Sequence, residues 1–120
     1  MNIELKRLNE VDKSEIIELM NHPLVLKHMP LATGNFGEED YKKFIVAKDR
    51  LWKENGYGPW AFFLNETFIG WGGLQPADED VEVAIVLHPS YWGMGKKIYE
   101  MIIKYAFQTL KLQSVIILSI

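Results

Sequence analysis

Segments with the apolar pattern of a strand recur along the chain. They occupy residues 3–8, 60–64, 67–74, 81–87 and 114–120. In the fourth segment every odd position is apolar, and Glu82 stands at an even position with Ala84 and Val86. Because strand side chains alternate between faces, we expect these two sets to lie on opposite faces of a sheet.

A first helix is predicted soon after the first strand. Asp12 followed by Glu15 matches a capping box, and the helix that it opens runs to Met20. The stretch from Asn21 to Gly37 contains two prolines and is predicted to be irregular.

Two further helices follow from apolar positions at a period near 3.6. Asn35 with Glu38 is a second capping pattern, and Gly56 is expected to end the helix that it opens. The apolar stripe of this helix is Tyr41, Phe44, Ile45, Leu51 and Trp52. The last helix runs to about Leu110 with a stripe of Ile98, Met101, Ile102, Tyr105 and Ala106.

The predicted order of elements is therefore β-α-α-β-β-β-α-β. Short turns at 65–66 and 77–80 join the three central strands into an antiparallel meander. The last helix connects two strands that we expect to run parallel. The pattern predicts an α/β (α+β) fold with a mixed, mostly antiparallel sheet flanked by helices. Glycines at 70, 72 and 73 would weaken their strand unless another group packs close to its backbone.

Composition narrows the functional class. The 120 residues suffice for one domain, and the net charge of −3 disfavours a general nucleic-acid binder. The absence of cysteine excludes a disulfide framework or a thiol nucleophile. No signal-peptide pattern precedes the first strand, and no apolar run approaches the length of a membrane span, so we expect a soluble cytoplasmic protein.

The stretch from Val81 to Lys97 carries the most specific chemistry. It reads as a strand, a turn, Gly93-Met94-Gly95 and a helix. Unpaired amides and a partial positive charge at a helix start, together with glycines that admit close approach, make a main-chain anion site. Lys96 and Lys97 add charge there, although cations are disfavoured at a helix start without an anion.

By itself, a Gly-x-Gly is more often a plain connection between a strand and a helix. The Walker phosphate loop is absent, and Ile98 stands where the dinucleotide fingerprint needs its third glycine. These two alternatives are set aside.

A family resemblance favours the functional interpretation. Tyr91-Trp92-Gly93-Met94-Gly95, after Leu87-His88-Pro89, resembles motif A of the GNAT acetyltransferases, above all the RimJ/RimL-like branch, whose members acetylate protein N-termini or small amines. The segments 56–61, 68–76 and 81–83 agree with it. The resemblance implies acetyl transfer from acetyl-CoA to a primary amine by direct attack, with no metal.

The same resemblance implies a cofactor-binding set around the glycine loop. It assigns the CoA pyrophosphate to the amides of Gly93, Gly95, Lys96 and Lys97, and it places Trp92 and Met94 along the loop. Val86 and Leu87 would pair with the pantetheine arm. The family usually has a small residue where this chain has Lys97, so CoA affinity is expected to differ there.

Glu82 is the candidate general base, because a carboxylate on the strand that borders the site can deprotonate an amine. The alternative is a solvated strand residue or an ion-pair partner. His88 is a rival candidate, since histidine titrates near neutral pH. His22 and His28 are candidates for substrate contact or simple surface residues.

Three aromatic residues leave two roles open. Tyr57, Trp60 and Trp71 would line an acceptor channel or pack in the core.

The family pattern continues beyond the strand reached at Ile120. We therefore expect a single domain over 1–120 that lacks the usual C-terminal helix and strand, with an apolar strand edge suited to a homodimer. The alternatives to an active acetyltransferase are a catalytically impaired CoA-binding or interaction module, and a purely structural domain.

Overall fold

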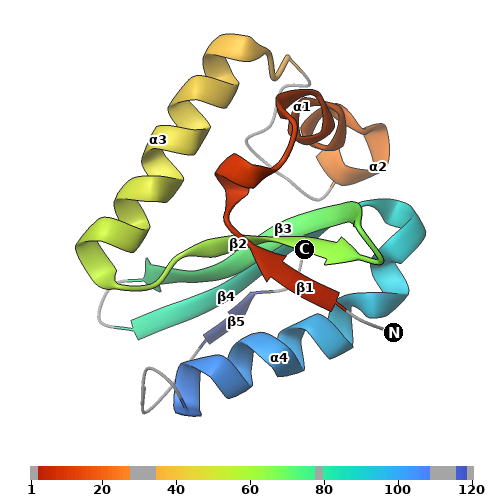
Figure 1. Cartoon of the computed structure of the whole chain (residues 1–120). Helices are drawn as coiled ribbons and strands as arrows, with labels where there is room; N and C mark the ends of the chain where they lie inside the picture. The colour runs from red at the N-terminus through yellow and green to blue at the C-terminus, as the bar shows by residue number, and fades with distance from the viewer. Residues whose placement is uncertain (1–2, 28–34, 78–79, 109–115, 119–120) are drawn as a thin grey trace.

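The computed structural model describes residues 3–27, 35–77, 80–108 and 116–118, which form one sheet with helices on both faces (Figure 1). The strands of these residues are β1 (Ile3–Lys6), β2 (Pro59–Leu64), β3 (Thr67–Ala77), β4 (Asp80–Leu87) and β5 (Ile116–Leu118). The helices are α1 (Lys13–Asn21), α2 (Pro23–Leu26), α3 (Glu38–Asn55) and α4 (Gly95–Gln108), with 3-10 turns η1 (Leu8–Glu10) and η2 (Pro89–Met94).

The pairing of the strands confirms the predicted fold class. The sheet order is β1-β2-β3-β4-β5, antiparallel from β1 to β4 and parallel between β4 and β5. The hairpin from β2 to β3 turns at Asn65 and Glu66, whose φ angles of 49° and 70° are those of a tight two-residue turn. The predicted end of the last helix near Leu110, and the outer residues of the last strand, lie outside the described residues.

The face of the sheet beneath α4 is an aliphatic core. Ile98, Ile102 and Ala106, spaced by four residues on α4, are all fully buried. They pack against the odd-numbered side chains of β4, which include Val83 at 0% and Ile85 at 4% exposure. The predicted separation of odd and even positions of β4 is thereby confirmed, because Val86 belongs to the core of the opposite face.

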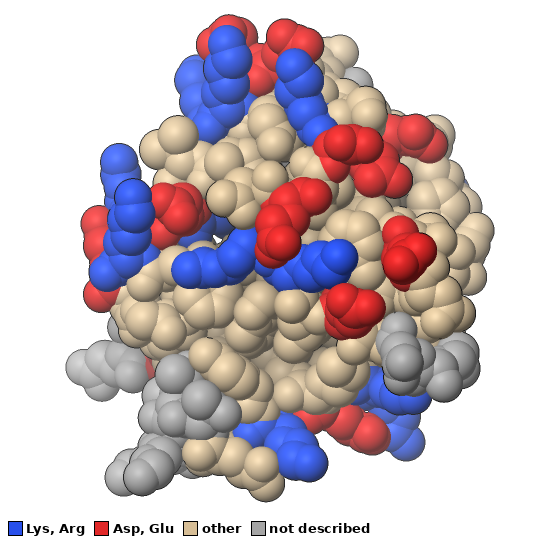
Figure 2. Space-filling view, viewed as in Figure 1, with Lys and Arg blue, Asp and Glu red and all other residues tan. Residues whose placement is uncertain are grey.

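The opposite face is covered by α1, α2 and α3 (Figure 1). Its core combines aliphatic residues of η1 and α1 with Phe63 and Trp71 of the sheet. Phe44 of α3 meets Trp71 edge to face, with 4.9 Å between the ring centroids. Charged side chains of both signs spread over α3 and the segment after β1 (Figure 2).

The start of α3 differs from the prediction. The N-cap is Gly37, whose amide donates to Asp40 Oδ2 at 2.9 Å, and not Asn35. The physical reason is that the Asn21 side chain bonds both backbone groups of Phe36, at 2.9 Å and 2.7 Å. These bonds hold the chain in place up to Gly37, which is extended, so that the helix begins two residues later than predicted.

The other predicted helix boundaries are mostly as expected. Gly56 ends α3 with φ 75°, which confirms its predicted role. Asp12 is the N-cap of α1, although its side chain makes no capping hydrogen bond. The stretch predicted to be irregular contains α2, because Pro23 at its first turn and His22 at its N-cap start a helix of only four residues.

Glycines in β3 allow the central strands to approach closely. A Cβ atom at Gly72 would overlap the carbonyl oxygen of Ala84 on β4, and the φ of Gly72 is 157°. This is the close backbone approach that the glycine-rich sequence predicted.

Candidate active site

The glycine loop leaves the sheet where β4 ends. The amide of His88 donates to the carbonyl of Ile69 at 2.9 Å, which extends the pairing with β3 by one residue. The His88 ring then caps η2, because its Nδ1 accepts from the amide of Ser90 at 3.1 Å. The direction of the loop is therefore fixed at its first residue.

Trp92 folds the loop back onto the strand. Its Nε1 donates to the carbonyl of Leu87 at 3.0 Å, and its indole remains 44% exposed. Met94 packs against the core beneath α4, so that one side of η2 is anchored and the other faces solvent.

The two loop glycines face open space. A Cβ atom at Gly93 would have no neighbour within 4 Å, and one at Gly95 would meet only Leu87 Cδ1, at 3.9 Å. The structure makes Gly95 the first residue of α4, and Lys96 and Lys97 beside it are exposed. The amide of Gly95 already donates to the carbonyl of Trp92 at the end of η2. The open glycines, the partial positive charge of the helix start and the two cations fit an anion such as a pyrophosphate.

The direction of the backbone groups along β4 follows from the bond between His88 and Ile69. Because hydrogen-bonding groups alternate along an antiparallel strand, Val86 directs its amide and carbonyl toward β3. Ile85 and Leu87 direct theirs toward the β5 side. The described pairing with β5 runs from Glu82 opposite Ile116 to Ala84 opposite Leu118, short of both residues.

Glu82 lies half-buried on the face that α1 to α3 cover, in line with Ala84 and Val86. Gln75 stands directly opposite on β3 and donates a hydrogen bond from Nε2 to Glu82 Oε1. At the usual rise of a strand, the Cα atom of Glu82 is about 17 Å from that of Leu87. The carboxylate thus stands at the far end of β4 from the glycine loop, with one oxygen held by the amide.

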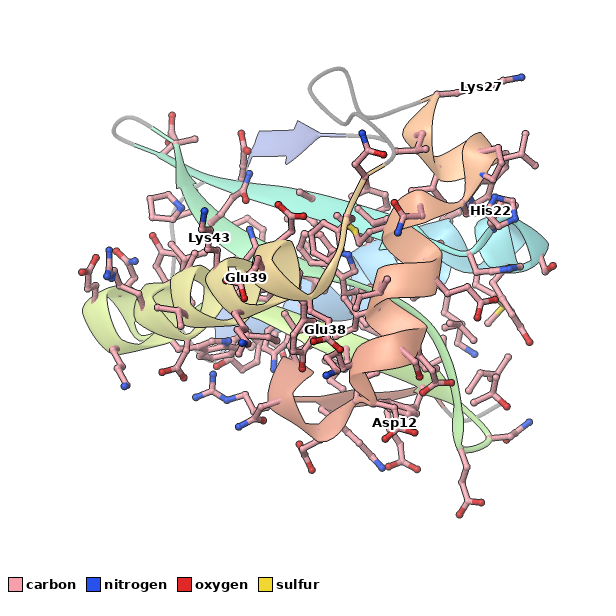
Figure 3. All side chains as sticks on the ribbon, turned by 90° about the horizontal axis from the view of Figure 1, so that it is seen from above. Asp12, His22, Lys27, Glu38, Glu39 and Lys43 are labelled. Atoms are coloured by element: carbon pink, nitrogen blue, oxygen red, sulfur yellow. The ribbon has the colours of Figure 1, made fainter. Side chains whose placement is uncertain are left out.

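Two of the predicted histidines come together. The rings of His22 and His88 lie 5.1 Å apart, edge to face. Each accepts a backbone hydrogen bond at Nδ1, His22 from Leu24 at 3.2 Å and His88 from Ser90. His22 is labelled in Figure 3, at the start of α2. Both therefore serve to fix chain turns, and His28 lies outside the described residues.

The three predicted channel aromatics divide between the faces of the sheet. Trp60 and Tyr57 belong to the core beneath α4, so core packing is the role that the structure gives them. Trp71 lies on the opposite face, where its Nε1 donates to the sulfur of Met20 at 3.4 Å.

Lys48 of α3 was missed by sequence reasoning. Its Nζ lies 5.1 Å from the centroid of the Trp71 ring and 5.5 Å from that of Phe44. Desolvation by burial lowers the pKa of its ammonium group. The signal was present, because position 48 falls four residues after Phe44 and four before Trp52 in the apolar stripe.

The described residues contain no group of three or more histidine, aspartate or glutamate side chains that could hold a metal ion. None of their helices is long and apolar enough to cross a membrane.

Comparison with known proteins supplies the family. A model described as the acetyltransferase (GNAT) domain matches residues 2–119. The chain belongs to the GNAT acetyltransferase family. Among curated proteins, no sequence matches it significantly.

Solved GNAT structures share the fold. A GNAT-family acetyltransferase from Bacillus anthracis is 19% identical, with a TM-score of 0.78 over 98% of this chain and 69% of that one. The N-acetyltransferase PseH of Campylobacter jejuni, solved with acetyl coenzyme A, is 24% identical, with a TM-score of 0.62 over 95% and 74%. A chimera of spermidine N-acetyltransferase SpeG from Vibrio cholerae and hSSAT is 15% identical, with a TM-score of 0.70 over 98% and 69%.

Proposed function

We propose that this GNAT domain transfers an acetyl group from acetyl-CoA to a primary amine. The observation that carries the proposal is the open glycine loop at the start of α4. The loop follows directly on β4, whose described pairing with β5 covers residues 82–84. The family assignment supports acetyl transfer in general, and these two features supply a place for the acyl donor.

The donor's pyrophosphate would lie on the amides of Gly93, Gly95, Lys96 and Lys97. The absence of side chains at both glycines lets an anion approach the backbone closely, and the exposed lysines add charge. The Gly95 amide donates to the carbonyl of Trp92, so the pyrophosphate would share or replace that bond. Lys97 is exposed at the helix start, so in this proposal it contributes a charge contact and does not crowd the anion. Trp92 would cover one side of the loop.

The pantetheine arm would pair with β4 as an added strand. For this pairing we propose Ile85 in place of Val86, because Ile85 directs its backbone groups toward the β5 side of β4 and Val86 directs its own toward β3. The carbonyl of Leu87 is already bonded to Trp92, so only its amide is left for the arm. An amide on this edge would also polarise the thioester carbonyl.

Glu82 would act as the general base. Gln75 holds one carboxylate oxygen, which orients the group and leaves the other oxygen to accept a proton from the attacking amine, directly or through a water molecule. The deprotonated amine attacks the thioester carbon, the new amide bond forms, and the CoA thiolate leaves.

The acceptor would be a protein N-terminus or a small amine, as the resemblance to the RimJ/RimL-like branch implies. The name of one structural neighbour includes spermidine N-acetyltransferase. This similarity is a reason to include a polyamine among the first acceptors that are tested. The cytoplasmic location stays a prediction. We also propose self-association at β5, the last strand in the sheet order, and a clean monomer in sedimentation at high concentration would contradict it.

Release of free CoA thiol from acetyl-CoA, with spermidine and with an unblocked peptide as acceptors, tests the reaction. Glu82→Gln keeps an oxygen for the Gln75 bond and removes the base, so we expect kcat to fall by about 10² to 10⁴. The matched control is Glu4→Gln, on an exposed position of β1, which should keep the parental rate.

The outcomes separate the proposals. Equal rates for the parent and Glu82→Gln would remove Glu82 from the mechanism. Binding of acetyl-CoA without transfer to any acceptor would favour the alternative of a catalytically impaired CoA-binding module.

A further inference from the structure

A groove of about 690 Å³ runs between α3 and the segment that follows β1. Its walls come from Arg7 to Asn9, from Ile45 to Glu54 on α3, and from Pro59 at the start of β2. It shares no residue with the glycine loop or with β4. Its volume lies in the range of sites that hold small organic molecules.

The charges around this groove are mostly positive, in a chain whose net charge is −3. Four lining side chains are cations, Arg7, Lys48, Arg50 and Lys53, and two are acids, Asp49 and Glu54. Asp49 is paired with Lys53 at 3.0 Å. Within the described residues, the other three cations have no carboxylate at ion-pair distance, and Glu54 stands exposed at the rim.

Lys48 is the most confined of these cations. Its ammonium group lies over the Trp71 and Phe44 rings, and desolvation lowers its pKa. A half-buried charge without an opposite charge is a cost to the folded state. An anion in the groove would remove that cost.

The guanidinium group of Arg7 lies over the face of an aromatic ring. Its guanidinium carbon lies 3.8 Å from the centroid of the Trp52 ring, and Trp52 is itself fixed by a bond of 2.9 Å from Nε1 to the carbonyl of Pro59. When a ring covers the face of a guanidinium group, the N–H groups along its edge remain able to donate a bidentate pair of hydrogen bonds to an oxyanion.

We propose that this groove is a second binding site, for a small organic anion with a carboxylate or phosphate group on an apolar body. Arg7 and Lys48 would bind the oxyanion, and the apolar side chains of Leu8, Ile45 and Pro59 would contact the body. Arg50, two residues from Lys48 on α3, projects from a different side of the helix and would add only a more distant charge. The site is independent of the glycine loop, and it does not rest on the acetyl-transfer proposal.

Calorimetric titration with three matched probes tests the chemistry. The probes are 2-naphthoate, 2-naphthyl phosphate and the uncharged 2-naphthamide, which share one apolar body. We expect saturable binding of an anion at one site, at least tenfold tighter than that of the amide. The tighter of the two anions identifies the group that the site prefers.

Variants locate the binding. Lys48→Met and Arg7→Gln should each weaken binding of the preferred anion at least fivefold. Lys43→Gln is the control, because Lys43 is exposed on the side of α3 away from η1 and outside the groove (Figure 3). Gly95→Trp, which alters the glycine loop only, should leave the affinity unchanged.

The proposal would be overturned by no saturable binding of either anion, by equal affinity for the amide, or by an equal loss in Lys43→Gln. Loss of binding in Gly95→Trp would also overturn it, since the probe would then occupy the glycine loop. Near-ultraviolet circular dichroism of each variant controls for folding.

Discussion

The helices α3 and α4 cover opposite faces of one sheet and do so in different ways. In α4, 14 residues long, Ile98, Ile102 and Ala106 are fully buried against β4. In α3, 18 residues long, no residue is fully buried. The longer helix therefore contributes less of its surface to the core.

The residue types explain the difference. The inner stripe of α4 is aliphatic and small, so the helix packs directly on the sheet. The stripe of α3 includes aromatic residues and Lys48, which meet the sheet through ring edges and a cation over rings. This packing leaves room for the groove beside Arg7. The packing of α4 on the sheet thus contributes more to the stability of the fold, and it supports the glycine loop at the start of the helix. The packing of α3 leaves charged side chains exposed around the groove.

Matched truncations of one isoleucine on each helix give the largest expected effect. Ile102→Ala leaves a cavity in the closed core and should lower the free energy of unfolding by about 2–5 kcal/mol. Ile45→Ala, at a half-buried position beside the groove, should lower it by about 1 kcal/mol or less. Urea unfolding measures both. Equal losses would mean that the two helices are packed alike.

A smaller effect of opposite sign is expected at Lys48. Lys48→Met removes a desolvated charge and keeps the apolar stem, so it should stabilise the unliganded protein by up to about 1 kcal/mol at neutral pH. Because the folded pKa lies below the unfolded one, the parent regains stability as pH rises through the lowered pKa. The difference in stability between Lys48→Met and the parent should therefore decrease as the pH rises from the folded pKa toward the unfolded pKa.

Unfolding midpoints of Lys48→Met and the parent, taken from neutral to alkaline pH, provide the test. Lys43→Gln, at an exposed position of the same helix, is the control and should show no such trend. A destabilised Lys48→Met at neutral pH would contradict the account of an uncompensated charge.

The smallest effect is expected where α3 meets α1. Lys13 Nζ lies 2.9 Å from Glu38 Oε1 at the start of α3, and this hydrogen bond and the charge of Lys13 lower the pKa of Glu38. A lowered carboxyl pKa stabilises the fold above the unfolded pKa and ceases to do so as pH falls through the folded one. Lys13→Gln should therefore match the parent at acid pH and fall slightly below it near neutrality.

Salt provides the check on this prediction. The pair is exposed, so added sodium chloride should reduce the difference in unfolding midpoint between Lys13→Gln and the parent. A difference that persists unchanged in high salt would mean that Lys13 acts through packing and not through its charge.

The sequence predicted those parts of the fold that depend on local pattern. The glycine that ends α3 and the two-residue turn at Asn65 and Glu66 are local signals, and the structure confirms them. Of the predicted stripe of α4, every residue except Met101 belongs to or packs against the core beneath the helix. The start of α3 could not be predicted in this way. It depends on Asn21, 15 residues away, whose side chain holds Phe36 extended.

In the candidate site, too, the local features were predictable from the sequence and the contacts between distant residues were not. The glycine loop was visible because its chemistry lies in consecutive residues. The partner of Glu82 required the register of the hairpin, which pairs it with Gln75 across the turn. The proposal of Ile85 in place of Val86 required the alternation of hydrogen-bonding groups along β4, which the bond from His88 to Ile69 fixes. Lys48 stood in the apolar stripe, but its position over Trp71 depends on the packing of α3 on β3.

The central claim is that the start of α4 binds the acyl donor, and calorimetric titration with acetyl-CoA tests it most directly. The titration compares the parent with Gly95→Trp and with Lys104→Trp. Lys104→Trp is the control, because it places the same side chain on an exposed position of the same helix. The account predicts that the parent and Lys104→Trp bind alike and that Gly95→Trp does not bind. Unchanged binding in Gly95→Trp, or no binding by the parent, would contradict it.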